Sequence, residues 1–573
     1  CIRAYSTAFD MKGITDNYAF DTPKVEDKIA IAKRCDVFDS QLNVSYPKLV
    51  TARPDLPIML IGMETLPNSK TKIPVATTVY NNPLNPDDYD AGNPSWTSAN
   101  DEMGNQGTSS MNYPMPYRNF DWKTLSKSFV IGGQTYKKIP LYAGMPPIGK
   151  LTFKKDYASS EMANNVICTE MYNAMAVGLK DTFPNCLNDA QATLDYTKYR
   201  LGLKGIPFFI FKYWNNEYTP MGMFNFIPNK NEEAYLGFTK PFTWEQSRAQ
   251  SWEIRDNNIF WDFYLDESSW DEAEGKLIKN CAFSYYEAIY PKDSENESGG
   301  ESLDFGDAST AAQVEISKNE TKDILRLHNW LVSTNQKLAT GALLAEPYVD
   351  ASGNTYNYDT PQYRLAKFVT EHNYYLTLDQ WILYYIWREQ FWMFDSGSKN
   401  LQLHTYDGQH WGCHVRDADT ALGIDNEGKF VFPPYLEDND FRTGSEFIFN
   451  QKTQPEGTET VLNGQMGAVW INIRDGFGDR IQQMYTTLYD NAALTKFNYD
   501  KCIAEFENHQ GQWSEALYNF GSHQYYGGAP YSKWISSGLG DKKNQRRFWL
   551  YYGFRYRASK YHAGSATNRI TWR

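Results

Sequence analysis

The first half of the chain carries short apolar runs separated by polar and turn-forming residues, a pattern that predicts strands. The run at 58–61 belongs to a loop-rich β region over about residues 1–90. A strand is expected at 150–155, and apolar runs on both sides of an Asn-rich turn predict a β-hairpin over 206–226. Residues 82–112 are dense in Asn, Asp, Gly, Pro and Ser, and we expect them to form a long irregular loop.

Helical periodicity dominates the second half. Ser-Lys-Asn-Glu at 317–320 has the form of a capping box, because an apolar stripe with helical spacing follows it. Thr-Pro at 360–361 predicts another helix start. An aromatic helix is expected over 377–392, and shorter helical pieces are expected at 480–488 and 503–506.

An acidic stretch at 291–315 joins the two halves and is interpreted as a linker or a surface insertion. One helix, from Ser159 to Met175, is expected among the strands that precede it. Strands followed by a linker and then by helices indicate an α+β fold with two lobes and a ligand cleft between them. The helical lobe then covers residues 316–573, including a C-terminal extension.

Length and composition add expectations about size and partners. At 573 residues the chain can bury a large core and suggests two to four domains. Aromatic residues reach 16%, with 41 Tyr and 17 Trp, so either extensive partner-facing surfaces or a Tyr-rich core is expected. The net charge of −13 disfavours nucleic acid as the partner of the whole chain, but residues 542–573 include nine basic residues. That segment is expected to contact an acidic partner or nucleic acid, or else to be a solvated helix face.

Cysteine and histidine positions argue against a structural metal site. The seven cysteines are scattered without C-x-x-C or Cys/His spacing, so neither a zinc site nor a disulfide framework is expected. His404, His410 and His414 lie on a predicted hairpin, where packing or substrate contact is expected. No apolar run approaches the ~20 residues that span a bilayer, and no signal peptide is visible. We interpret Cys1 as a processed N-terminus or as the first ordered residue of a longer protein.

The residues with the clearest chemistry lie between 395 and 428. Asp395 and Asn400 have the D-x-x-x-x-N spacing of a kinase catalytic loop, in which the Asp accepts the substrate hydroxyl proton and the Asn holds a metal. A predicted hairpin separates them from Asp417 and Asp419, which stand where a kinase carries the carboxylate that binds Mg²⁺. This order predicts groups that converge on one Mg²⁺-nucleotide.

These residues also have simpler interpretations. A D-x-x-x-x-N pair recurs by chance in long chains, and Asp417 or Asp419 is also suited to capping a turn. A calcium-binding loop does not fit, because the positions that an EF-hand fills with Gly and Glu are Leu422 and Gly428.

Four segments, taken in order, resemble the CotH kinase family, the atypical kinases first known from spore coats. The resemblance covers about residues 100–430. The matching segments are the Gln-Gly-Thr-Ser-Ser run at 106–110 with the strand after it, the lysine strand and following helix at 151–165, the hairpin at 207–226, and the catalytic loop with the D-x-D turn at 395–423.

This resemblance implies a bilobal atypical-kinase fold, with residues 91–290 as the N-lobe and with Mg²⁺ and ATP as cofactors. The site residues that it implies are the catalytic base Asp395, the metal or loop ligand Asn400, the metal carboxylates Asp417 and Asp419, the phosphate contact Lys154, and the helix partner of that lysine, Glu161. The chain departs from the family pattern because it lacks a plain Asn-Gly hairpin turn and a G-x-G-x-x-G phosphate loop.

The aromatic C-terminal region resembles the large tail proteins of Bacteroidota-infecting phages, in particular the muzzle-type proteins of crAss-like phages. The segments that carry this resemblance are 469–475, 546–552 and 556–561. It implies a structural virion component that assembles with other tail subunits in a homo-oligomeric ring. We therefore expect a phage tail protein, as a processed fragment, on a CotH-kinase-like core. The alternatives are an active atypical kinase, secreted or on a cell surface, that transfers phosphate from Mg²⁺-ATP to protein, and a carbohydrate-binding protein, which rests on aromatic content alone.

Overall fold

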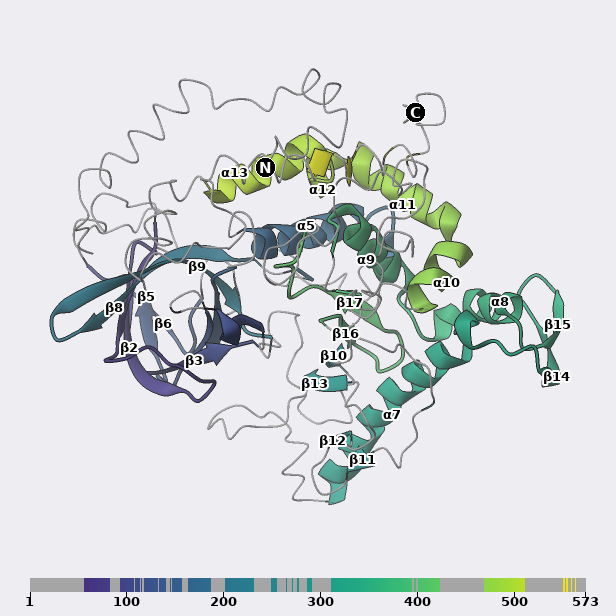
Figure 1. The fold of residues 1–573 in the computed structure, drawn as a ribbon, viewed down its shortest axis with the longest axis horizontal. Helices are drawn as coiled ribbons and strands as arrows, with labels where there is room; N and C mark the ends of the chain where they lie inside the picture. The colour runs from purple at the N-terminus through teal and green to yellow at the C-terminus, as the bar shows by residue number, and fades with distance from the viewer. Residues whose placement is uncertain are drawn as a thin grey trace.

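The computed structural model has both helices and strands, which confirms the α+β class (Figure 1). Strands of a barrel dominate the N-terminal part, and helices dominate the C-terminal part. With short gaps, the described residues are 56–82, 93–186, 201–230, 249–254, short strands between 270 and 290, 311–422, 468–510 and 550–562.

Seven strands close into a barrel, at the left of Figure 1, in the spatial order β1-β2-β3-β4-β7-β9-β8. Neighbouring strands run antiparallel except β1 and β8, whose parallel pairing closes the barrel. Closure pairs both edges of every strand in the barrel. The strands are β1 (Ile58–Gly62), β2 (Ile73–Tyr80), β3 (Trp96–Gln106), β4 (Asn119–Thr124), β7 (Lys150–Lys154), β8 (Ile206–Trp214) and β9 (Glu217–Pro228).

Aromatic side chains from the barrel strands stack in the hydrophobic core. Phe226 lies between Phe153 and Phe208, with both ring-centroid distances at 4.0 Å. Trp122 Nε1 donates to Thr77 Oγ1 at 3.1 Å, and both side chains are buried. This hydrogen bond satisfies a buried donor that would otherwise destabilise the core.

Two strand predictions are confirmed. The strand predicted at 150–155 is β7, and the hairpin predicted over 206–226 consists of β8 and β9. The two turn residues, Asn215 and Asn216, have φ values of 50° and 63°. A two-residue hairpin turn that follows the twist of the strands requires positive φ at both positions. Asn tolerates this conformation better than other non-glycine residues, so the Asn pair serves in place of Asn-Gly.

The irregular loop predicted over 82–112 is wrong, because β3 occupies Trp96–Gln106. This strand pairs with β2 on one side and β4 on the other, so its backbone groups are satisfied despite a polar sequence. Only its core-facing side chains, such as Trp96 and Met103, have to be apolar. The barrel also combines strands from both sides of residue 90, so the segment boundary predicted there falls inside one structural unit.

Helices and a four-stranded sheet form the other part of the molecule, at the right of Figure 1. The sheet, in the order β13-β10-β16-β17, consists of β10 (Gln250–Ile254), β13 (Tyr286–Tyr290), β16 (Gln402–Thr405) and β17 (Gly412–His414). The helices are α5 (Asn164–Leu179), α7 (Ala311–Ser333), α8 (Pro361–Glu371), α9 (Leu378–Gln390), α10 (Ala468–Gly476), α11 (Gly478–Asp490), α12 (Ala492–Thr495) and α13 (Tyr499–Gln510).

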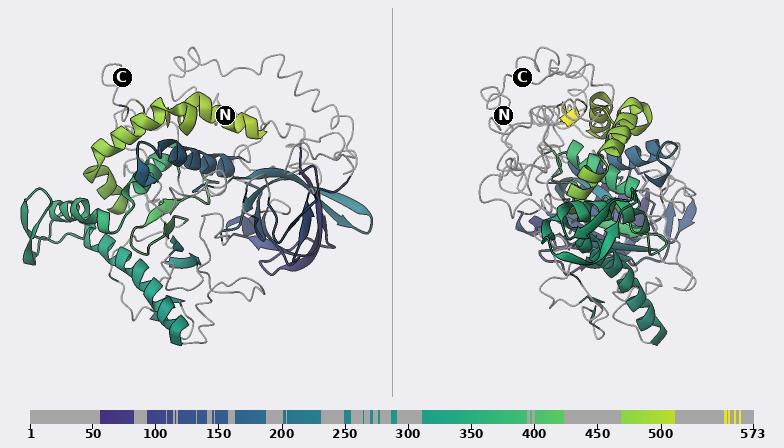
Figure 2. Two further views of the ribbon diagram at one scale, coloured as in Figure 1. Left: turned by 180° about the vertical axis from the view of Figure 1, so that it is seen from behind. Right: turned by 90° about the vertical axis from the view of Figure 1, so that its right-hand side faces the viewer.

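Shorter elements connect these parts. Two-stranded pairs are β5 (Phe129–Ile131) with β6 (Gln134–Tyr136), β11 (Trp270–Asp271) with β12 (Lys276–Leu277), and β14 (Leu343–Val349) with β15 (Thr355–Tyr358). Short 3₁₀ turns are η2 (Ser109–Asn112), η3 (Pro184–Cys186), η7 (Gln336–Leu338) and η8 (His372–Tyr374). In the views of Figures 1 and 2, α13 runs beside α5, and the β14–β15 hairpin projects at the end farthest from the barrel.

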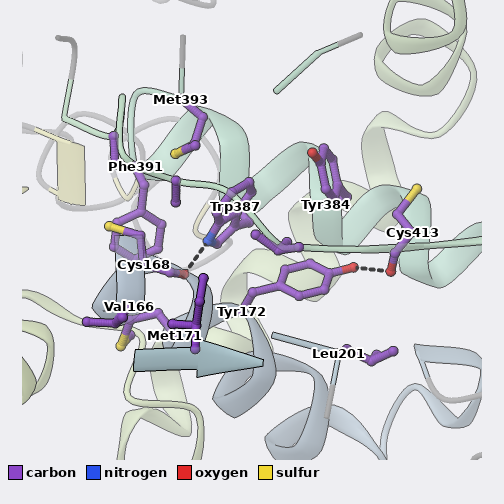
Figure 3. Close-up of a cluster of buried hydrophobic side chains, with 14 of the residues drawn as sticks. Val166, Cys168, Met171, Tyr172, Leu201, Tyr384, Trp387, Phe391, Met393 and Cys413 are labelled. Atoms are coloured by element: carbon purple, nitrogen blue, oxygen red, sulfur yellow. Dashed lines mark hydrogen bonds between the residues drawn. The ribbon is translucent and has the colours of Figure 1, made fainter. Parts of the chain in front are cut away.

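Helices α5 and α9 form the centre of the helical core (Figure 3). Trp387 Nε1 on α9 donates to Cys168 O on α5 at 2.7 Å. The Tyr172 hydroxyl on α5 donates to Cys413 O on β17 at 3.0 Å. All four residues are buried, so these bonds satisfy polar groups that water does not reach. The packing fixes α5 against the hairpin that contains β17.

Most helix predictions are confirmed. Helix α8 begins directly after Thr360, whose Oγ1 accepts from the backbone N of Tyr363 at 3.2 Å. The helices predicted over 377–392, 480–488 and 503–506 correspond to α9, α11 and α13. These helices were predicted from a local feature, either an N-terminal cap or an apolar stripe that packs on the core. In these cases the tertiary structure agrees with the local preference.

Other predictions for this part are corrected. The capping box at 317–320 is wrong as a helix start, because α7 begins at Ala311 and runs through those residues. The preceding Ala-Ala-Gln-Val-Glu has good helix propensity and extends the helix. The part predicted as helical, 316–573, also contains four strands, β14 to β17.

Some predictions fall on segments that the structure does not describe. Residues 291–310 of the predicted linker and most of the basic segment 542–573 lie outside the described residues. Among the described helices, none is long and apolar enough to cross a membrane. Among the described residues, Cys168, Cys186, Cys413 and Cys502 are buried and form no disulfide.

Candidate functional site

Lys154, the last residue of β7, contacts the segment that follows β17. Its Nζ donates to Asp417 Oδ2 at 3.0 Å, across 263 positions of sequence. The lysine side chain is 6% exposed and the aspartate side chain 30%, so the ammonium is buried while the carboxylate keeps access to solvent. Burial alone would lower the pKa of Lys154, but Asp417, followed by Asp419 and Asp156, outweighs burial and raises this pKa above its ordinary value. The structure thus brings together three predicted site residues, the lysine and both aspartates of the D-x-D turn.

The start of α5 fixes the position of the D-x-D turn. Asn165 Nδ2 donates to Asp417 Oδ1 at 3.0 Å, and Asn165 Oδ1 accepts from the backbone N of Ala418 at 3.2 Å. Asn164 Nδ2 donates to Ala421 O at 3.1 Å. The N-terminus of a helix carries partial positive charge, which also favours a carboxylate at this place. One carboxylate oxygen of Asp417 is therefore bonded to the barrel lysine, and the other is bonded to the helix that follows this lysine in sequence.

The β16–β17 hairpin brings Asn400 to the same region. Gln402 pairs with His414 in antiparallel register, so residues just before β16 and just after β17 lie at the same end of the hairpin. Asn400 and Asp417 flank that end. Asn400 has a φ of 69°, a left-handed conformation that Asn adopts more readily than most residues. The loop amide, the hairpin and the carboxylate, which follow one another in sequence, thus also form a compact local structure.

Two predicted site residues, Asp395 and Glu161, lie outside the described residues. Their placement relative to Lys154 stays a prediction. Within α5 itself, the first turn contains no acidic residue, and Asn165 occupies the position that faces the D-x-D turn.

A further carboxylate, Asp156, lies two residues beyond Lys154 and is only 2% exposed. Its Oδ2 accepts from Asn225 Nδ2 at 3.1 Å, and Asn225 is the β9 residue directly opposite Lys154. Asn225 Oδ1 in turn lies 3.1 Å from Nε2 of His509 on α13. Burial raises the pKa of Asp156 to about 7, with Lys154 acting in the opposite direction. A buried polar network therefore runs from α13 through Asn225 to Asp156.

The turn between β3 and β4 lies at the lysine end of the barrel. Gln106 pairs with Asn119, and Asn119 Oδ1 accepts from the backbone N of Lys155 at 2.8 Å. Gly107 has a φ of 89°, and a Cβ there would lie 2.6 Å from Ser110 Oγ, so this position requires glycine. The Ser110 hydroxyl donates to Gln106 O. Gly107 and Ser110, which belong to the segment that resembles the family's Gly-Asn-Ser-Ser run, thereby lie close together in the connection between β3 and β4.

The donor set suits Mg²⁺ bound together with a nucleotide better than a metal ion held by protein alone. Among the residues that the structure describes, no group of three or more His, Cys, Asp or Glu side chains is arranged to hold a metal. Mg²⁺ at nucleotide sites is bound through one or two carboxylates, with phosphates and waters as the other ligands. Asp417 and Asp419 supply that number of carboxylates, and Asn400 adds an amide at the same end of the hairpin.

The histidines of this hairpin have a packing role. His404 and His414 are buried, with their Nδ1 atoms 3.1 Å apart. Burial lowers the pKa of His404 to about 3 and the pKa of His414 well below its ordinary value, so both rings are neutral near pH 7. One ring donates and the other accepts in this contact. His410 lies at the exposed end of the hairpin, with its Nδ1 2.6 Å from Asp407 Oδ2.

A comparison of the sequence with known protein families finds no family that matches, and a comparison with curated proteins finds no similar protein. The interpretation of the site consequently rests on its geometry. The elements that carry it are the barrel strands β7 and β9, the start of α5, the β16–β17 hairpin and the end of α13.

Sequence reasoning missed four residues of this region. For Asn165, which bonds to the D-x-D turn, the sequence offered one clue. This clue was the Asn-Asn pair at the expected start of a helix. Asp156 had a weaker signal, its place directly after a Lys-Lys strand end. Asn225 and His509 had none, because their contact joins β9 to a helix that starts almost three hundred positions later, which no local pattern encodes.

Proposed function

We propose that this chain is a kinase-like protein that binds Mg²⁺ and a nucleoside triphosphate between Lys154 and the D-x-D turn of Asp417 and Asp419. The observation that carries the proposal is the Lys154–Asp417 contact, which joins the lysine strand to the candidate metal turn. A phosphate-binding lysine on a sheet strand and a metal-binding aspartate after a hairpin are the two groups that kinases bring together around the nucleotide phosphates.

The order of parts along the chain supports the same proposal. The chain has, in order, a glycine-containing connection between two strands, a lysine strand, a helix, a loop with Asp395 and Asn400, a hairpin and an aspartate turn. The functional parts of a kinase follow one another in a similar order. The barrel and the helical part would correspond to the two lobes of a CotH-like kinase. In this proposal Asp395 is the catalytic base, and Glu161 is a further candidate partner of the lysine.

The chemistry assigned to the site follows from its charges. Mg²⁺, when bound, would neutralise the negative charge of the phosphates and orient them. Asp417 and Asp419 would hold the ion, and Asn165 keeps the first of these carboxylates oriented through its amide. Asp417, with smaller effects from Asp419 and Asp156, raises the pKa of Lys154 above its ordinary value despite burial, so this lysine would present a positive charge to a phosphate oxygen.

The proposal is tested by calorimetric titration with Mg²⁺ and a non-hydrolysable ATP analogue. Replacing Asp417 by Asn removes a metal carboxylate, so we expect affinity to fall by about tenfold or more, the effect of losing one charged metal contact. Asp407→Asn is the matched control, because Asp407 lies at the opposite, exposed end of the same hairpin. Asp395→Asn is expected to retain binding and to lose phosphoryl transfer. Absence of binding at millimolar nucleotide would overturn the proposal.

A second candidate function, a subunit of a phage tail, is favoured by the projecting β14–β15 hairpin (Figures 1 and 2). One face of the hairpin packs on α8, where the rings of Tyr348 and Tyr363 lie 5.3 Å apart. Leu343 and Tyr358 are paired across the hairpin, and they and Val349 are each more than half exposed. The outward face of such a hairpin is normally polar, and clustered exposed apolar side chains are typical of contact surfaces. Under this proposal the surface contacts a second copy of the chain in an oligomeric ring.

A further inference from the structure

Asn165, in the first turn of α5, contacts two consecutive residues of the D-x-D turn with its side-chain amide. Its Nδ2 donates to Asp417 Oδ1 at 3.0 Å, and its Oδ1 accepts from the backbone N of Ala418 at 3.2 Å. The side chain is fully buried. Because a backbone N–H can only donate, the amide oxygen must face Ala418 and the amide nitrogen must face Asp417. The orientation of this amide is therefore fixed.

A second carboxylate lies next to the same amide. Burial raises the pKa of Asp156 to about 7, and a hydrogen bond from the Asn165 side chain acts in the opposite direction. An amide nitrogen carries two hydrogens, so it can donate to Asp417 and to Asp156 together. An ionised acidic side chain at this place would have no hydrogen to donate and would be repelled by both carboxylates. The surroundings of Asn165 thus favour an amide.

The acidic residue of α5, Glu170, lies on a different face of the helix. It follows Asn165 by five positions, which at 3.6 residues per turn places it about 140° away around the helix axis. The contact between α5 and the D-x-D turn is therefore made by the amide and not by a helix carboxylate.

Asp417 is held by two donors, one on each of its oxygens. Lys154 Nζ donates to Oδ2 at 3.0 Å, and Asn165 Nδ2 donates to Oδ1. An ionised carboxylate has about four lone-pair sites, so acceptor capacity remains on both oxygens. The Asp417 side chain keeps access to solvent, which leaves this capacity available to an ion from solution.

The lysine is itself a competitor of a metal ion for this carboxylate. An ammonium group carries three N–H donors, so without the Asn165 amide the Oδ1 atom could turn toward the same ammonium. Asp417 would then be closed on Lys154 with both oxygens, and a metal ion would have to break that contact in order to bind. The hydrogen bond from Asn165 to Oδ1 opposes this closure.

We propose that Asn165 is a positioning residue that keeps Asp417 open to Mg²⁺ beside Lys154. This inference rests on the proposed nucleotide-binding function and adds a requirement to it. It assigns Asn165 no contact with the metal, with the nucleotide or with any reacting atom. Replacing a side chain that hydrogen-bonds to a metal ligand typically lowers metal affinity by about 10- to 100-fold.

The Mg²⁺ requirement of nucleotide binding tests the inference. Asn165→Leu keeps the approximate size of the side chain and removes its polar groups. We expect the Mg²⁺ concentration that gives half-maximal binding of a non-hydrolysable ATP analogue, measured by calorimetry, to rise by about tenfold. Asn165→Ala is the second variant, because Ala favours the helix, and its Mg²⁺ requirement is expected to rise as well.

Asn173→Leu is the matched control. Asn173 is a buried residue of the same helix, and its Oδ1 accepts from the backbone N of Leu201 at 3.0 Å, so this substitution also removes a hydrogen bond made by α5. The bond lies about two helical turns beyond Asn165, away from the D-x-D turn. The Mg²⁺ requirement of Asn173→Leu is therefore expected to equal that of the unaltered chain.

Each outcome decides between defined alternatives. If the unaltered chain binds the nucleotide and neither Asn165 variant has a higher Mg²⁺ requirement, this inference is wrong and the proposed function stands. If both variants lose binding and high Mg²⁺ does not restore it, Asn165 supports the fold and not the metal, and the inference is also wrong. An equal rise for Asn173→Leu contradicts it too, because the effect is then not specific to Asn165. If the unaltered chain binds no Mg²⁺-nucleotide, both the inference and the proposed function are overturned.

Discussion

At the scale of single residues, Lys155 shows how strongly burial changes a side chain in this barrel. It is fully buried, and its Nζ donates to Met221 O at 3.1 Å and to Met223 O at 3.0 Å. The same atom lies 4.4 Å from the centre of the Phe224 ring. Burial lowers the pKa of Lys155 to about 7, because the charged form loses its hydration. The lysine next to it, Lys154, has the opposite shift, because carboxylates surround it.

Replacing Lys155 by Met should therefore change how stability depends on pH. An unfolded lysine has a pKa of about 10.4, so between about pH 7 and 10 the unfolded state binds more protons than the folded state. The free energy of unfolding of the unaltered protein then rises with pH, by about 1.4 kcal/mol per pH unit for one proton. Lys155→Met lacks this rise. Urea unfolding across that pH range measures it, and identical pH profiles for the two proteins would contradict the prediction.

Residue-scale chemistry was predictable only where sequence order encodes it. Lys154 and Asp417 could be singled out because a lysine strand and a D-x-D turn follow each other in a recognisable order. Asp156 and Asn225 could not, since their bond depends on the register by which β7 pairs with β9. A carboxylate two positions after a lysine is common in any chain, and only the fold distinguishes this one.

At the scale of elements, local sequence signals predicted the helices and turns whose conformation tertiary contacts did not change. The cap of α8 and the Asn-Asn turn between β8 and β9 act within a few residues, and both were read correctly from sequence. The strand β3 was missed, because its stability comes from pairing on both sides in a closed barrel. The predicted start of α7 was wrong, because helix-forming residues precede the cap-like sequence and extend the helix toward the N-terminus.

The cap of α8 makes a direct prediction. Thr360 Oγ1 satisfies the backbone N of Tyr363, so Thr360→Ala should lower the free energy of unfolding by about 1 kcal/mol. Thr360→Asn should retain most of the stability, because Asn is also a good N-cap residue. Thr487→Ala is the matched control, since the Thr487 hydroxyl bonds to Gln483 O inside α11 and caps nothing. Urea unfolding checks all three variants. An equal loss for Thr360→Ala and Thr487→Ala would show that capping is not the cause.

At the scale of the whole molecule, the projecting β14–β15 hairpin separates the two candidate functions. A nucleotide-binding protein has no need of it, whereas a ring of subunits needs a contact surface away from the barrel. Within the part of the chain that the structure describes, the hairpin packs against α8, through contacts such as Tyr348 against Tyr363. A two-stranded hairpin gains little stability on its own, so a second contact with its exposed apolar side chains would stabilise it further.

We therefore expect the chain to self-associate through this hairpin. The double substitution Leu343→Lys and Val349→Lys places charge inside the contact, so it is expected to weaken the association by about tenfold or more. Sedimentation velocity over a range of protein concentrations measures the change. Leu494→Lys is the matched control, because Leu494 is equally exposed, at 69% against 72% for Leu343, but lies on α12. A chain that stays monomeric at high concentration would contradict the assembly proposal. Equal weakening by Leu494→Lys would place the contact elsewhere on the surface.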